Sequence, residues 1–195
     1  MPVEYLKETP SQTAGPFVHI GTLPSVAGLA VRSQEKPNVL AGAAGRGQRI
    51  RVEGIVHDGA GEPVRDAVIE LWQADAEGRY GTREFPGWGR AAADFKTGQW
   101  WFETVKPGPV AEGGTTHAPC LTLLILARGI NVPLHTRLYF ADEDKANAAD
   151  PVLRSIPGAA MRETLIATRA ERDGEVVYTL DIHLQGDRET VFFDA

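Results

Sequence analysis

The chain has 195 residues, of which 43% are hydrophobic and 24% are charged, and its formal net charge is −6 at neutral pH. This composition is that of an ordinary globular protein and excludes collagen-like, coiled-coil and largely disordered chains. The 20 basic residues form no tract, so we expect neither nucleic-acid binding nor attachment to an anionic membrane.

Residues 1–48 show no sustained hydrophobic period and are rich in proline and glycine. A loop of that length without structure of its own is uncommon inside a compact domain. Its apolar content is nevertheless too high for a solvated leader. We therefore expect residues 1–48 to form an ordered arm that packs on a partner chain or on its own domain, and residues 49–195 to form a single domain.

From residue 49 onward the sequence predicts short strands. Residues 49–56 alternate polar and apolar side chains, the pattern of a half-buried strand. The continuous apolar run 121–128 suits a strand that is buried on both faces. The other expected strands are 67–73, 99–105, 136–140, 176–184 and 190–193, whereas 74–98 is expected to be irregular.

Helical signal is confined to residues 142–149, where Asp150 and Pro151 end the pattern. Seven or eight short strands separated by turn-forming residues favour a mainly β fold. The expected architecture is a β-sandwich with a long N-terminal arm and a few short helices.

Cys120 is the only cysteine, so an internal disulfide is impossible and a reducing compartment is expected. The first twelve residues lack the apolar core of a secretory signal. The longest apolar run is far shorter than the ~20 residues of a membrane span. These features predict a cytoplasmic protein that is not attached to a membrane.

Residue patterns alone reveal no self-sufficient active site. The sequence has no phosphate-binding glycine loop and no serine in a nucleophile elbow, and its five histidines show no zinc-binding spacing. Because Cys120 lies beside the buried run, we expect it to be a small core residue rather than a nucleophile.

Several longer motifs resemble the intradiol ring-cleavage dioxygenases, ferric enzymes that cut catechols between the two hydroxyls. The main ones are residues 64–80 (VRDAVIELWQADAEGRY) and 105–109 (VKPGP). Residues 9–17 (TPSQTAGPF), 136–140 (TRLYF) and 189–193 (ETVFF) are also typical of that family. The resemblance covers nearly the whole chain and implies the β-sandwich of that family.

Members of this family hold ferric iron with two tyrosines and two histidines. The resemblance aligns the tyrosines with Tyr80 and Val110, and the histidines with Cys120 and Thr122. Ferric iron favours hard oxygen ligands and imidazole, which valine cannot supply and threonine supplies poorly. No iron is therefore expected in this chain, and these four residues are expected to be vestigial ligand positions.

Loss of the ligands is itself typical of one chain of the two-chain family members that cleave protocatechuate. The resemblance implies a homologous β partner that carries Fe(III), in an assembly of several αβ pairs. At the shared site, protocatechuate and O2 would give 3-carboxy-cis,cis-muconate in aromatic catabolism. The lone chain is expected to be inactive.

The resemblance also implies that Thr13, Gly15, Pro16 and Arg128 line the partner's substrate site. A planar guanidinium recognises a carboxylate well, which fits Arg128 to the carboxylate of protocatechuate. Arg137 is the alternative arginine, although the resemblance places it in the chain's own vestigial pocket.

Two other interpretations remain open at this point. Residues 61–72 would also fit a free-standing transthyretin-like β-sandwich that binds a ligand. Such a module would, however, leave the apolar side chains of the arm exposed to solvent. A self-sufficient iron dioxygenase with unusual ligands would have to use Val110 and Thr122, which argues against it.

Overall fold

The computed structural model describes residues 7, 9–10, 12–29, 37–40 and 46–194. Its helices are α1 (Val18–Thr22), the 3-10 helix η1 (Pro24–Ala27), α2 (Asp144–Ala149), α3 (Pro151–Ser155) and α4 (Ala159–Glu163). Its strands are β1 (Arg49–His57), β2 (Val68–Gln73), β3 (Trp88–Ala92), β4 (Gln99–Val105), β5 (Val110–Glu112), β6 (Thr115–His117), β7 (Cys120–Leu126), β8 (Leu134–Phe140), β9 (Ile166–Arg172), β10 (Glu175–Thr179) and β11 (Ile182–His183).

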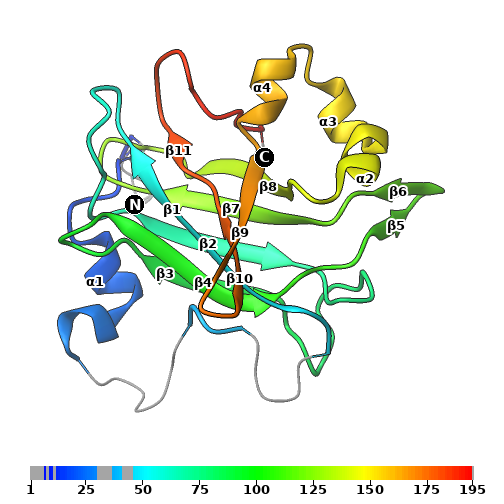
Figure 1. Cartoon of the computed structure of the whole chain (residues 1–195). Coiled ribbons are helices and arrows are strands. Elements are labelled where there is room, and N and C mark those ends of the chain that lie inside the picture. The colour runs from blue at the N-terminus through cyan, green and yellow to red at the C-terminus, as the bar shows by residue number, and fades with distance from the viewer. Residues whose placement is uncertain (1–6, 8, 11, 30–36, 41–45, 195) are drawn as a thin grey trace, which may run out of the picture.

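One hydrogen-bonded sheet runs in the order β11-β1-β10-β9-β8-β7-β2-β3, and β4 pairs with β1 off that path. The two ends of β9 pair differently: Ile166 and Ala167 pair with β8, whereas residues 168–172 pair with β10. The sheet therefore folds over at β9 into two layers, which Figure 1 shows crossing over one another. The mainly β, sandwich-like fold predicted from the sequence is confirmed.

The main core lies between these two layers. β1 and β4 contribute Val52 and Phe102 from one side, and β2 and β7 contribute Ile69 and Leu123 from the other. All four side chains are fully buried. Because strand side chains alternate between faces, the residues between them point to the outer face of each layer.

A second cluster lies on the outer face of β7 and β8, beneath α3 and the segment leading to β9. Figure 1 shows α2, α3 and α4 gathered together on this side of the sheet. Asp150 starts α3 by accepting hydrogen bonds from the backbone N–H groups of Val152 and Leu153, and Pro151 occupies the first helical position.

The described parts of the N-terminal segment pack on the domain itself. The N–H of Leu40 donates to the carbonyl of Glu103 on β4 at 2.8 Å. The N–H of Arg90 on β3 donates to the carbonyl of Pro37 at 2.9 Å. A Cβ at Gly89 would lie 2.5 Å from Leu40, so glycine permits this close approach. Packing of the arm on a partner chain stays a prediction.

Several predicted element boundaries were wrong. Residues 74–98 are not wholly irregular, since they contain β3, and the described residues form eleven strands rather than seven or eight. The expected strand 176–184 is divided into β10 and β11, while 190–193 makes only an isolated bridge, from Phe193 to His135. β7 is fully buried on its inner face and half-buried at most outward positions. No helix of the described residues is long and apolar enough to cross a membrane.

Candidate functional site

The outer face of β8 and β7 carries three of the positions that the sequence singled out, namely Cys120, Thr122 and Arg137. Thr122 lies opposite Arg137 of β8 on one side and opposite Trp72 of β2 on the other. Trp72 is in turn opposite Trp88 of β3. Because directly opposed residues have neighbouring side chains, these four form a row across the sheet. Cys120 lies on β7 two residues before Thr122, where it is opposite Tyr139 of β8.

Tyr80 stands beside this row. Its ring lies parallel to that of Trp72, with centroids 5.9 Å apart and an interplanar angle of 10°. Burial raises the pKa of Tyr80, Cys120 raises it further, and Arg137 opposes the shift. The structure thus brings Tyr80, Cys120 and Thr122 together on one face, with Arg137 among them.

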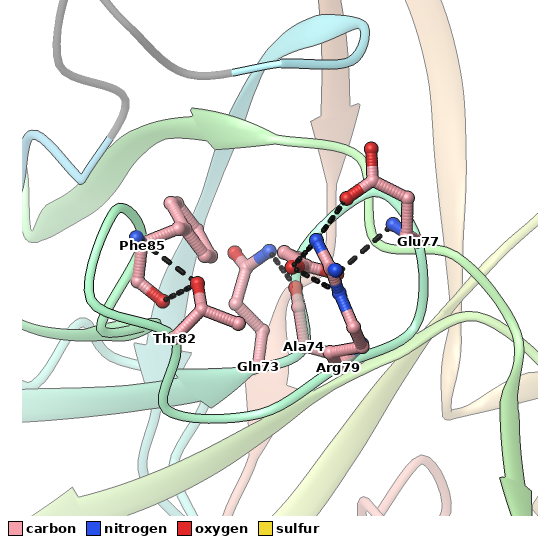
Figure 2. A network of polar contacts seen from close by, with 7 residues as sticks. Gln73, Ala74, Glu77, Arg79, Thr82 and Phe85 are labelled. Carbon is pink, nitrogen blue, oxygen red and sulfur yellow. Dashed lines mark hydrogen bonds and ion pairs between the residues drawn. The ribbon is translucent and has the colours of Figure 1, made fainter.

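A tight turn holds the segment that leads to Tyr80. One oxygen of Asp75 accepts hydrogen bonds from the backbone N–H groups of Glu77 and Arg79, at 3.0 and 2.9 Å. Its other oxygen accepts from the Arg79 guanidinium at 3.1 Å, and Figure 2 shows that guanidinium also reaching Glu77. Burial alone would raise the pKa of Asp75, but the bonds from Arg79 and Glu77 outweigh it and hold that pKa below the ordinary value.

Val110 lies next to the same turn. Gly78 has a positive φ of 77°, and a Cβ there would lie 2.1 Å from the carbonyl oxygen of Pro109 and 3.6 Å from the Cα of Val110. Glycine is therefore needed for the turn and the Pro109–Val110 backbone to approach each other. Val110, which starts β5, thus lies close to the turn that leads to Tyr80, whereas Cys120 and Thr122 lie on β7.

The side chains at these positions do not fit ferric iron. Val110 has no donor atom, and Thr122 offers only a hydroxyl. Burial raises the pKa of the Cys120 thiol to about 11, so its thiolate form is disfavoured. Among the residues that the structure describes, no group of three or more His, Cys, Asp or Glu side chains is arranged to hold a metal ion.

Beside these positions lies a buried polar network centred on Asp150. The hydroxyl of Tyr139 donates to one Asp150 oxygen at 3.2 Å, and the N–H of Ala118 donates to the other at 2.9 Å. His117 Nδ1 lies 3.6 Å from that second oxygen. Arg137 Nη1 reaches the Tyr139 oxygen at only 3.4 Å. The Asp150 carboxylate thus accepts hydrogen bonds on both oxygens, whereas the hydrogen bond between Arg137 and Tyr139 is long.

The predicted substrate-binding residues form a second group, at the far end of β7. The backbone N–H of Gly129 donates to the Thr13 hydroxyl at 2.6 Å, and that hydroxyl donates to the Ala14 carbonyl at 3.0 Å. Ala14 also forms a parallel bridge with Arg128. The structure therefore brings the arm and the Arg128 loop side by side. The Thr13 hydroxyl is bonded within this chain, and its contact with the substrate stays a prediction.

Arg128 extends from this loop with its side chain 65% exposed, and its Nε lies 3.0 Å from a carboxylate oxygen of Asp66. Neither Asp66 oxygen accepts a hydrogen bond, so the two side chains form an ion pair without hydrogen-bond alignment. A Cβ added at Gly15 would meet no atom within 4 Å, and Pro16 is exposed. Gly15, Pro16 and Arg128 are consequently accessible from outside the chain.

Sequence reasoning missed two carboxylates that organise these sites. Asp66 was noticed only as part of a motif, and nothing in its sequence neighbourhood indicates a partner 62 positions away. Asp150 was interpreted as the end of a helix. The dipeptide Asp150–Pro151 is equally a helix start, since aspartate is a favoured N-cap and proline is favoured at the next position.

The dioxygenase family model matches residues 24–186 of this chain. A protocatechuate 3,4-dioxygenase alpha chain from Pseudomonas putida is 50% identical over 200 residues, covering all of both chains. A protocatechuate 3,4-dioxygenase beta chain from Burkholderia cepacia is 33% identical over 157 residues, covering 72% of this chain and 66% of the relative.

A solved structure shares the fold. It is the dioxygenase domain of a dioxygenase and carbohydrate-binding protein fusion from Streptomyces sp. SirexAA-E. Its TM-score to this chain is 0.59 at 24% sequence identity, and the match covers 79% of this chain and 88% of the other. At that identity the likeness concerns the fold alone.

Proposed function

Since this chain belongs to the dioxygenase family, we propose that it is the iron-free α subunit of a protocatechuate 3,4-dioxygenase. The observation that carries the proposal is the full-length, 50% identity to an α chain of that enzyme. The side chains of Val110 and Thr122, which do not fit iron, support the same assignment. In this proposal the chain completes an active site and supplies no metal ligand.

The partner is a homologous β subunit that holds Fe(III). The 33% identity to a β chain supports a pair of related chains that assemble with one another. Iron supplies the activation of the catechol toward O2, and the reaction opens the ring of protocatechuate between its hydroxyls to give 3-carboxy-cis,cis-muconate. We place the assembly, with several αβ pairs, in the cytoplasm, because the single cysteine is buried and forms no disulfide.

The contribution of this chain is to bind and orient the substrate. Arg128 is mostly exposed and can turn its guanidinium toward the carboxylate of a protocatechuate molecule bound in the adjoining chain. Gly15 and Pro16 offer a small, fixed stretch of backbone that an aromatic ring can approach closely. Thr13 acts as a positioning residue, because its hydroxyl bonds hold the arm beside the Arg128 loop.

Reconstitution tests the proposal. This chain and its β partner are purified separately and then mixed, and protocatechuate turnover and assembly mass are measured. Turnover by the equimolar complex and none by this chain alone is the expected result. Ring cleavage by the lone chain would overturn the proposal in favour of a self-sufficient enzyme, and failure of the two chains to assemble would favour a free-standing binding module.

A further inference from the structure

Two histidines face one another where the short strand β11 joins the sheet. β11 pairs with β1 in parallel, and the register sets His183 directly beside His57. Their rings are stacked, with centroids 4.8 Å apart and an interplanar angle of 13°. Because β11 consists only of Ile182 and His183, this ring pair supplies much of the side-chain contact between the two strands. We call His57 and His183 the histidine clasp.

The clasp also anchors the segment that follows it. The N–H of Leu184 donates to the carbonyl of His57 at 2.9 Å. The N–H of Thr190 donates to the carbonyl of His183, and the N–H of His183 donates to the Thr190 hydroxyl, each at 2.9 Å. Thr190 is buried, whereas residues 185–189 are exposed, and Figure 1 shows this segment in red beyond β11. Separation of β11 from β1 therefore frees residues 184–190 as well.

The two rings differ in how well their surroundings accommodate a proton. Nδ1 of His57 lies 3.1 Å from the carbonyl oxygen of Gly61, and its Nε2 lies 3.9 Å from a carboxylate oxygen of Asp181. Both ring nitrogens of His57 thus face oxygen atoms, as an imidazolium requires. Among the residues that the structure describes, no acceptor lies within hydrogen-bond distance of the His183 ring. A proton on His183 would therefore lie beside the His57 ring without a partner of its own.

The charged groups around the clasp favour the neutral form of His183. Burial lowers the pKa of His183, the charges of Arg188 and His57 lower it further, and Asp181 opposes the shift. In the turn after β1, an Asp58 oxygen accepts hydrogen bonds from two backbone N–H groups of that turn. The other acidic side chains of the turn and of the segment after β11 are exposed, namely Glu62, Asp187 and Glu189.

We propose that the histidine clasp is an acid-sensitive switch: when His183 takes up a proton, β11 separates from β1 and residues 184–190 are released. Two adjacent imidazolium rings repel one another, and separation returns His183 to water, where it binds the proton more tightly. Attachment is therefore complete above the ordinary histidine pKa of about 6.5 and weakens as pH falls below it. The switch lies on β1 and β11 and does not rest on the subunit role proposed above.

Hydrogen–deuterium exchange of the full-length chain, followed by mass spectrometry, tests the switch. Exchange rates are divided by the intrinsic amide rates, which removes the ordinary pH dependence of exchange and gives protection factors. In the peptide that spans residues 184–190, protection is expected to fall by at least about threefold between about pH 7.5 and about pH 5. The peptide 99–105, which is β4 in the core of the domain, should keep its protection.

Four variants separate the switch from a general loss of structure, and circular dichroism confirms that each is folded. His183→Gln takes up no proton and should show equal protection at both pH values, whereas His117→Gln makes the same change outside the clasp and should behave as the wild type does. Asp181→Asn should enlarge the fall and Arg188→Gln should reduce it, because their charges act on His183 in opposite directions.

Three results would overturn the proposal. The first is an unchanged protection of residues 184–190 in the wild type at the lower pH. The second is a fall of the same size in His183→Gln or in the core peptide, since either would show general acid unfolding. The third is a shift in the same direction for Asp181→Asn and Arg188→Gln, which decides the matter even where His183→Gln does not fold.

Discussion

The Nε atom of Arg128 lies 3.0 Å from Oδ2 of Asp66, and the two side chains differ sharply in environment: Arg128 is 65% exposed, whereas Asp66 is 6% exposed. The guanidinium of Arg128 thus lies beside a buried carboxylate but makes no aligned hydrogen bond with it. Its N–H groups remain available for another carboxylate.

Replacing Arg128 should therefore affect substrate binding more than iron content. In the assembled complex, Arg128→Ala is expected to raise KM for protocatechuate, because loss of a hydrogen bond between charged groups costs about 1.5–3 kcal/mol, or roughly ten- to a hundredfold. Steady-state kinetics and metal analysis of the complex measure both quantities. An unchanged KM would remove Arg128 from the substrate site.

Thr13 is expected to act through arm position. Thr13→Val removes the oxygen that accepts from Gly129 N–H at 2.6 Å and should weaken assembly with the partner by about 1 kcal/mol, roughly fivefold in affinity. Thr13→Ser keeps the hydroxyl and serves as the matched control. Analytical ultracentrifugation gives both affinities, and equal losses for the two variants would show that the hydroxyl is not what matters.

Cys120 should be unreactive in the folded protein. Burial raises the pKa of its thiol to about 11, so very little thiolate is present at pH 8 and the sulfur is poorly accessible. Labelling with a thiol-specific disulfide reagent is expected to be far slower in the native chain than in the chain unfolded with guanidinium. Rapid native labelling would indicate an open, ionised thiol and reopen a ligand role for Cys120.

Asp75 should make stability depend on acid pH. Its folded pKa lies below the ordinary aspartate value, so the stabilisation is complete above the unfolded pKa and is lost as pH falls through the folded pKa. Urea unfolding should show Asp75→Asn less stable than the wild type at pH 7, with the difference shrinking below about pH 4. Asp144→Asn, at an exposed position of α2, is the control for the charge change. A difference independent of pH would contradict this role.

The sequence predicted those strands whose own side-chain pattern decides their structure. β1 alternates polar and apolar residues, and β4 has three consecutive aromatic residues and is followed by a proline-rich turn, so both were located to within a residue. β3 was missed because WGRAA has no such pattern and becomes a strand by pairing with β2. β9 was missed because most of its residues are polar and exposed.

The candidate sites divide in the same way. The family motifs predicted that Tyr80, Cys120 and Thr122 share one vestigial pocket. In the structure, the register of β7 with β2 sets Thr122 opposite Trp72, and the ring of Tyr80 stacks on that of Trp72. The pairing of Arg128 with Asp66 could not be predicted, since it depends on how a loop after β7 folds back beside the turn before β2.

The central claim, that this chain completes an iron enzyme without holding iron, is tested most directly by the iron content of the chain purified alone and in complex with its β partner. The account predicts essentially no iron in the lone chain and about one iron per pair of chains in the complex. Val110 offers no donor atom, and the buried thiol of Cys120 and the hydroxyl of Thr122 do not suit ferric iron. Stoichiometric iron in the lone chain would contradict it.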